Sequence, residues 1–131
     1  AQLLPTGAIV PVAGSEWDHR DYRLIGLRRF NHCYVQLERD GDGMATASLR
    51  HVQNGRVIDV VMDRAFSSVV VYTGDAISGA ARRAFAIEPM TCATDALNHP
   101  EWNLKHLAPE ETFSGCYWIK HRSYLAPEGL L

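Results

Sequence analysis

One carboxylate, Glu88, stands where acid–base chemistry could use it. It follows the apolar run Phe85 to Ile87 and directly precedes Pro89. If that run is a buried strand, desolvation raises the pKa of Glu88 and makes it a competent general base near neutral pH. Pro89 fixes its own φ and biases Glu88 toward an extended conformation, so the carboxylate would be held in one direction. An edge-strand glutamate turned toward solvent is the alternative, and these residues alone leave it open.

Polar and aromatic side chains elsewhere could hold a ligand. Asn31 and His32 stand at the start of a strand-like segment, where both could hydrogen-bond a bound molecule. Tyr72 ends another such segment, and aromatic rings can stack on the apolar face of a sugar. Core packing is the alternative for every aromatic residue, and it is favoured for Trp118, which lies in an apolar run. The remaining aromatic candidates are Trp17 and Trp102.

The histidines and cysteines are not spaced as metal ligands. The six histidines form no His-x-His, His-x-x-x-His or His-Glu-x-x-His pattern, so we expect no metal site. The three cysteines are far apart and include no Cys-x-x-Cys pair, which argues against a disulfide framework and favours a reducing, cytoplasmic compartment. No Gly-x-Ser-x-Gly elbow or glycine-rich phosphate loop occurs. We therefore expect no cofactor.

Composition narrows the class of partner. The chain has 131 residues, of which 47% are hydrophobic and 21% charged, as in an ordinary globular domain. Its formal net charge of -2 provides no basic surface for a nucleic acid or an anionic membrane. No apolar run approaches the roughly 20 residues that span a bilayer. A neutral small molecule is the expected partner.

Alternating apolar residues and β-branched runs predict an all-β domain that occupies residues 1–131. Turn residues at Arg39–Gly43 and Gln53–Gly55 predict tight connections and a meander of antiparallel strands. Asp18 and Arg20 predict a local ion pair at a turn. A long loop, with one short helical turn at Asp95 to Asn98, should precede the last strand. The predicted strands are Cys33–Glu38, Met44–His51, Arg56–Asp63, Ser67–Thr73, Ala84–Glu88 and Phe113–His121.

Six blocks of this sequence, in this order, resemble the C-terminal half of the aldose 1-epimerase (galactose mutarotase-like) family. Together they extend over nearly the whole chain, and their order is more specific than any one block. They are Pro5–Val12 (PTGAIVPV), Glu16–Arg20 (EWDHR), Asn31–Val35 (NHCYV), Val69–Asp75 (VVVYTGD), Ala86–Asn98 (AIEPMTCATDALN) and Leu107–Ile119 (LAPEETFSGCYWI).

This resemblance implies the C-terminal part of a large antiparallel β-sandwich, the galactose mutarotase-like supersandwich. It also implies an isomerase that interconverts the α and β anomers of a hexose. In that reaction a glutamate takes the proton of the anomeric hydroxyl and a histidine protonates the ring oxygen. Glu88 falls on the glutamate, and Asn31, His32 and Tyr72 fall in blocks that bind the sugar.

The chain also departs from the family. Family members commonly have Asp where Asn31 stands, and many have Gln where Val70 stands, so two polar contacts to the sugar are weakened or lost. In the family, the acid histidine and other substrate-binding residues belong to the N-terminal half of the fold. We expect this chain to need such an N-terminal half as its partner. We therefore expect the 131 residues alone to be inactive. The alternative readings are a non-catalytic carbohydrate-binding β-sandwich and a fragment that does not fold by itself.

Overall fold

Six strands make up the computed structural model of this chain, which describes residues 4–124. Within that range there is no helix, and so none that could cross a membrane. The all-β prediction is confirmed. In chain order the strands are β1 (Asn31–Val35), β2 (Ala45–Arg50), β3 (Arg56–Met62), β4 (Ser68–Tyr72), β5 (Ala86–Met90) and β6 (Tyr117–Ser123).

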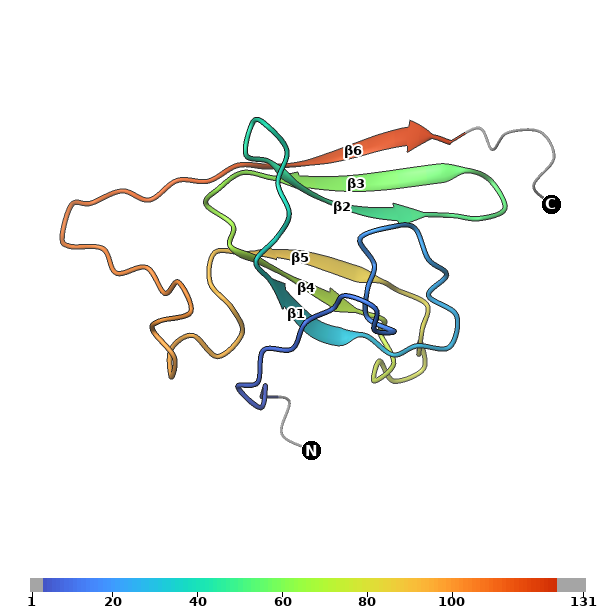
Figure 1. Cartoon of the computed structure of the whole chain (residues 1–131), viewed down its shortest axis with the longest axis horizontal. Helices are drawn as coiled ribbons and strands as arrows, with labels where there is room; N and C mark the ends of the chain where they lie inside the picture. Colours follow the sequence, from blue (N-terminus) through green and yellow to red (C-terminus); the bar gives the residue numbers. More distant parts are fainter. Residues whose placement is uncertain (1–3, 125–131) are drawn as a thin grey trace.

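The strands form two antiparallel sheets, one above the other (Figure 1). One sheet has the order β1-β4-β5 and the other β2-β3-β6. Runs of β-branched residues supply the middle strand of each sheet, RVIDVVM in β3 and SVVVY in β4, as expected for strands that pack on a core. The predicted antiparallel β-sandwich is the observed architecture.

Apolar side chains from both sheets fill the space between them. The buried cluster contains Ala45, Val60, Met62 and Val69, with Tyr34 and Ile87 packed against it. Successive residues of a strand point to opposite faces, so the neighbours of Val69 and Ile87 point away from this core. The outer face of the β1-β4-β5 sheet therefore carries Val70 and Glu88.

The order of the strands differs from a simple meander. β2 and β3 form the predicted hairpin, which the His51 amide closes by donating to the carbonyl of Arg56 at 2.8 Å. β1, however, pairs with β4, so the turn at Arg39–Gly43 carries the chain from one sheet to the other. The meander prediction is wrong at this point because turn residues specify a change of direction and not the sheet that the next strand joins.

Every strand differs from its predicted bounds by one or more residues, and the differences in β1 and β5 bear on the site. β1 ends at Val35 because Gln36 adopts a positive φ of 54°, whereas the prediction continued the strand to Glu38. β5 continues through Pro89, which a strand tolerates at a sheet edge, where one side of the backbone has no ladder partner. Glu88 thus lies inside β5 and not at its end.

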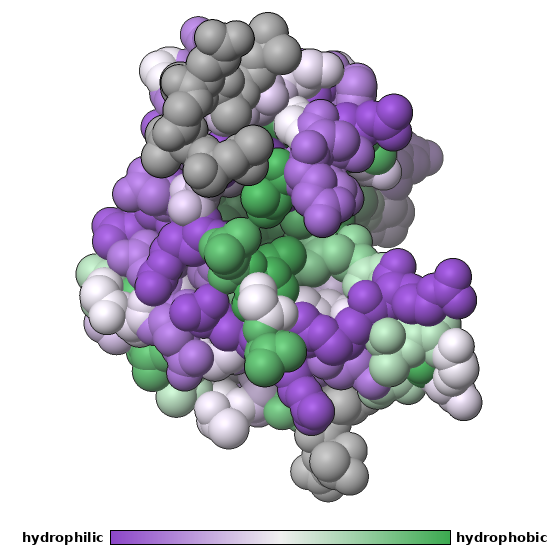
Figure 2. Space-filling view, turned by 90° about the vertical axis from the view of Figure 1, so that its right-hand side faces the viewer, coloured by the Kyte–Doolittle hydropathy of each residue, from purple (hydrophilic) through white to green (hydrophobic). Residues whose placement is uncertain are grey.

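β6 is exposed on both faces, and the predicted core position of Trp118 is wrong. All seven residues of β6 are exposed, and Trp118 keeps 44% of its surface accessible. The predicted strand Phe113–His121 forms as Tyr117–Ser123, and residues 113–116 belong to the preceding loop. Within residues 4–124 too little chain lies over β6 to bury it. Figure 2 views the end of the molecule that lies at the right of Figure 1, and there apolar residues reach the surface between hydrophilic ones.

The long loop predicted before the last strand is present as residues 91–116. It contains successive tight turns, in which the amide of Asn98 donates to the carbonyl of Asp95 and that of His99 to Ala96. Asp95 has a positive φ of 71°, which an α-helical turn does not allow. The predicted helical turn is therefore replaced by non-helical turns.

Candidate functional site

Three of the four predicted site residues share the outer face of the β1-β4-β5 sheet. In the antiparallel register, Asn31 is opposite Tyr72, and Tyr72 is opposite Ala86. Two residues along each strand, Cys33 is opposite Val70, and Val70 is opposite Glu88. Because directly paired residues point to the same face, Asn31, Tyr72 and Glu88 face one side of the sheet.

Glu88 points into solvent, so the expectation that its carboxylate is desolvated is wrong. It is the exposed member of β5, between the half-buried Ile87 and Pro89. The apolar run before it does form a strand, but the strand lies at the sheet edge and turns this side chain outward. Within residues 4–124 nothing donates a hydrogen bond or forms an ion pair with its carboxylate. The group is consequently free to meet a ligand from outside.

Asn31 and Tyr72 differ in how far they are held in place. The phenol oxygen of Tyr72 accepts a hydrogen bond from the amide of Ala76 at 3.0 Å, which ties the ring to the turn after β4. Asn31 is exposed at the start of β1, and its backbone amide donates to Nδ1 of His32 at 3.2 Å. Within residues 4–124 no hydrogen bond engages the side-chain amide of Asn31, which can therefore meet a ligand, whereas Tyr72 contributes mainly a fixed ring.

His32 lies on the opposite face from Glu88. Its ring contacts Trp17, with ring centroids 4.2 Å apart and planes tilted by 35°, and its centroid lies 6.1 Å from that of Phe30. Although the residue as a whole is exposed, desolvation of the ring lowers the pKa of His32, and Glu16 acts in the opposite direction. The structure therefore separates His32 from the three residues that it brings together.

Loops border the outer face at both ends of its strands. At one end, the hydroxyl of the fully buried Ser68 donates to the carbonyl of Cys92, which holds the start of the 91–116 loop against β4. At the other end, Asp75 accepts from the guanidinium of Arg82 at 2.9 Å and from the hydroxyl of Thr73. These hydrogen bonds hold the pKa of Asp75 below its usual value, and the one from Thr73 has the largest effect. Glu88 lies between the two loops.

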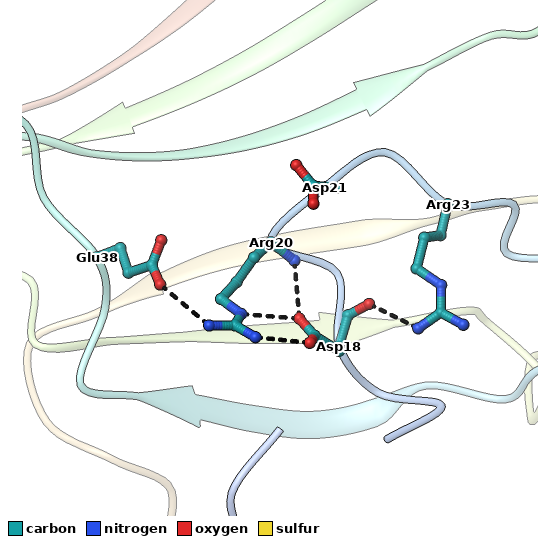
Figure 3. Close-up of a pocket in the computed structure, with 5 residues that line it drawn as sticks. All are labelled: Asp18, Arg20, Asp21, Arg23 and Glu38. Atoms are coloured by element: carbon teal, nitrogen blue, oxygen red, sulfur yellow. Dashed lines mark hydrogen bonds and ion pairs between the residues drawn. The ribbon is translucent and has the colours of Figure 1, made fainter. Parts of the chain in front are cut away.

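A charged pocket is lined by Asp18, Arg20, Asp21, Arg23 and Glu38 and not by Glu88 (Figure 3). Arg20 binds Asp18 through two nitrogens, at 2.9 and 2.7 Å, which confirms the predicted ion pair. Arg20 also reaches Glu38 at 3.7 Å, and Arg23 donates to the carbonyl of Asp18 at 3.0 Å. The hydrogen bond from Arg20 is the main cause of the strongly lowered pKa of Asp18. Since these charges largely neutralise one another, the pocket is a structural cluster.

The aromatic ligand candidates are used in packing. Trp17 makes edge contact with Phe30, at a centroid distance of 5.4 Å, besides its tilted contact with His32. Trp102 stacks on His99 in the 91–116 loop, with centroids 4.0 Å apart and planes 14° from parallel. Trp17 therefore packs on the side of His32, opposite Glu88, and Trp102 packs within the 91–116 loop.

The described part of the chain contains no group of three His, Cys, Asp or Glu side chains placed to hold a metal ion. Cys33, Cys92 and Cys116 are free thiols. Among Asn31, Tyr72 and Glu88 on the outer face, Glu88 supplies the carboxylate.

Comparison with known proteins gives the family. The model of the aldose 1-epimerase family matches residues 1–120. This chain belongs to the aldose 1-epimerase family. Galactose mutarotase of Mus musculus is 27% identical over 137 residues, and that of Rattus norvegicus is 26% identical over 135 residues. Each match covers 90% of this chain but only 38% of the relative. No solved structure gives a significant match.

Two features of this aldose 1-epimerase chain emerge only from the pairing of strands. Cys33 and Val70 lie in one row with Glu88, although Cys33 is 55 positions away in the sequence. Nothing in the local sequence of β1 or β5 indicates this, because β1 pairs with β4 across an intervening hairpin. The sequence marks Val70 only as a departure from the glutamine common in the family. The strand register of β4 and β5 shows that Val70 is the direct neighbour of Glu88.

Proposed function

We propose that the protein is a sugar epimerase of the mutarotase type, which interconverts the α and β anomers of a hexose, with Glu88 as general base. The observation that supports this most directly is the shared outward face of Asn31, Tyr72 and Glu88 in a chain of the aldose 1-epimerase family. A sugar lying on this face would meet an unpaired carboxylate, a free amide and a fixed aromatic ring.

The proposed reaction moves two protons. Glu88 takes the proton of the anomeric hydroxyl, the bond between C1 and the ring oxygen breaks, and C1 becomes a carbonyl. The electron pair of the broken bond stays on the ring oxygen, which takes a proton from an acid. After rotation about the C1–C2 bond, the ring oxygen returns its proton and attacks the other face of C1. Glu88 then gives its proton back to O1, so the base is regenerated.

The acid of this reaction comes from outside the outer face described above. His32 is turned toward Trp17, and no other histidine shares the face with Glu88 in the pairing of β1, β4 and β5. The chain spans about 38% of the length of the mutarotases it matches, which leaves room in such proteins for the acid elsewhere. For this reason we expect the 131 residues by themselves to accelerate mutarotation negligibly.

The extended backbone of β5 suits the role given to Glu88. Proton transfer requires the base to stay within hydrogen-bond reach of the anomeric oxygen, and a small displacement costs much of the rate. Ile87 and Pro89 point inward on either side of Glu88, and Ile87 packs against the core. The carboxylate is thus mounted on a fixed strand while its oxygens remain open to the sugar.

Polarimetry with freshly dissolved α-glucose or α-galactose tests the proposal in the complete protein. Glu88→Gln should lower the enzymatic rate by about 10²- to 10⁴-fold, the usual contribution of a general base. Glu110→Gln is the matched control, because Glu110 is an exposed carboxylate in the loop before β6. A Glu88→Gln protein that remains as active as the control would refute the assignment.

The second candidate is a carbohydrate-binding β-sandwich without catalysis, which the exposure of Glu88 and the lack of a nearby acid favour. In that case Glu88 accepts a hydrogen bond from a sugar hydroxyl and transfers no proton. Titration calorimetry would then detect hexose binding that weakens in Glu88→Gln, while polarimetry would find no acceleration by either protein.

A further inference from the structure

The surroundings of Glu88 on its own face are apolar on one side. Val70 is its direct partner on β4, and Cys33 is the direct partner of Val70 on β1. Directly paired side chains in an antiparallel sheet have Cβ atoms about 5 Å apart. Both Val70 and Cys33 are half-buried, so part of each side chain remains accessible to a bound molecule. A ligand whose reacting oxygen meets Glu88 must therefore extend over Val70 or away from it.

The other side of Glu88 is open. β5 is an edge strand, paired only with β4 in the part of the chain that the structure describes. Within residues 4–124 the row Cys33–Val70–Glu88 thus has an apolar side, toward β1, and an unpaired edge, beyond β5. Val70 has no polar atom, and a thiol is only a weak hydrogen-bond donor.

These two sides fix how a sugar can lie, if the proposed function is correct. C1 has two ring neighbours, the ring oxygen and C2, and the bonds to them diverge, so the two atoms cannot both lie over Val70. The ring oxygen must receive a proton, and Val70, the direct neighbour of Glu88 toward β1, has none to give, while the thiol of Cys33 lies one strand further away. The ring oxygen therefore points beyond β5, and C2 lies over Val70. A hydroxyl on C2 would lose water against Val70 without gaining a hydrogen bond, whereas a methylene group would lose nothing.

We propose that Val70 is a specificity-determining residue, and that it directs the site to hexoses without a hydroxyl at C2, the 2-deoxy aldoses. This inference rests on the proposed function for the placement of C1 beside Glu88. The geometry that carries it is the direct pairing of Val70 with Glu88 on an outward face. Asn31 and Tyr72, two residues further along their strands, remain available for hydroxyls more distant from C1.

The test compares glucose with 2-deoxyglucose in the complete protein. For each sugar, kcat/KM for mutarotation is measured by polarimetry and corrected for the uncatalysed rate, and Kd is measured by titration calorimetry. Val70→Thr keeps the shape of the side chain and adds a hydroxyl, and Val70→Asn adds an amide with longer reach. Thr46→Gln, on an exposed position of β2 in the other sheet, controls for a new polar side chain as such.

The unmodified protein should handle 2-deoxyglucose at least as well as glucose in both measurements. In Val70→Thr and Val70→Asn the ratio of 2-deoxyglucose to glucose should fall about three- to tenfold, the effect of one neutral hydrogen bond, and Thr46→Gln should leave it unchanged. A preference for glucose in the unmodified protein, an unchanged ratio in both Val70 variants, or no binding of either sugar would overturn the inference. If Glu88→Gln retains full activity, the proposed base fails instead, and the Kd ratio still tests Val70.

Discussion

At the scale of single residues, the direction of a side chain decides its use. Glu88 and Val70 point outward because Ile87 and Val69 point into the core, and this alternation is a property of the strand. The sequence predicted that Glu88 lies in a strand and that Asp18 binds Arg20. It could not predict the exposure of Glu88, because exposure depends on what lies over the sheet, which the local sequence does not record.

The buried ring nitrogen of His19 predicts a pH dependence of stability. Nε2 of His19 is buried and has no hydrogen-bond partner within residues 4–124. Desolvation, followed by the positive charges of Arg23 and Arg28, lowers the pKa of His19 in the folded chain. As the pH falls below about 6.5, the unfolded chain takes up this proton and the folded chain does not. The free energy of unfolding should therefore decrease between pH 7.5 and pH 5.5.

Urea denaturation at the two pH values measures this decrease. His19→Phe keeps a ring beside Phe30, whose centroid lies 5.1 Å away, and removes the titrating group, so its stability should change less with pH. His106→Phe, in the exposed part of the 91–116 loop, is the control. Asp59 and Asp75 do not contribute to the pH dependence in this window. Their pKa values are lowered by folding, so the stability that they provide is lost only in stronger acid. An identical pH dependence in all three proteins would contradict the role of His19.

At the scale of strands and loops, what could be predicted depended on distance along the chain. The β2–β3 hairpin joins strands that are adjacent in the sequence, and the residues between the strands favour its turn. The pairing of β1 with β4 is not local, because β2 and β3 intervene and enter the other sheet. The neighbours of Glu88 belong to this second kind of pairing. The sequence alone therefore places Glu88 in a strand but does not give the row of paired residues in which it stands.

A buried carboxylate on β3 ties three elements of the opposite sheet together. Asp59, only 7% exposed, accepts from the hydroxyl of Ser48 on β2 at 2.6 Å and from two nitrogens of Arg122 on β6 at 2.6 and 3.2 Å. Arg122 also donates to the phenol oxygen of Tyr22 at 2.9 Å, which connects the segment before β1. These hydrogen bonds keep the pKa of Asp59 below its usual value, with Arg122 as the main cause.

Asp59→Ala should lower the free energy of unfolding by about 1.5–3 kcal/mol, the range for hydrogen bonds to a charged group. Asp42→Ala, an exposed aspartate before β2, should change it by less than about 0.5 kcal/mol. Urea titrations of both variants, and of Arg122→Ala with and without Asp59→Ala, supply the comparison. Since the two residues are partners, the double variant should lose less than the sum of the single losses. Strict additivity would show that the contact contributes little.

At the scale of the whole molecule, the two sheets expose more strand surface than an isolated domain usually does. β6 pairs with β3 on one side only, and its other edge is unpaired within residues 4–124. Tyr117 and Ile119 of this strand keep 52% and 68% of their surface accessible. The mutarotases that this chain matches are much longer than the match, so such proteins contain further chain able to cover these edges.

The 131 residues by themselves should consequently associate through β6. An unpaired edge that also carries exposed apolar side chains is a template for pairing with another strand, and a charged residue on the edge opposes it. Size exclusion with light scattering over a range of concentrations should show association of the unmodified chain, and Ile119→Lys should reduce it. Leu27→Lys is the matched control, since Leu27 is 93% exposed but lies outside every strand. A chain that stays monomeric at every concentration, or an equal effect of both lysines, would show that the β6 edge does not drive association.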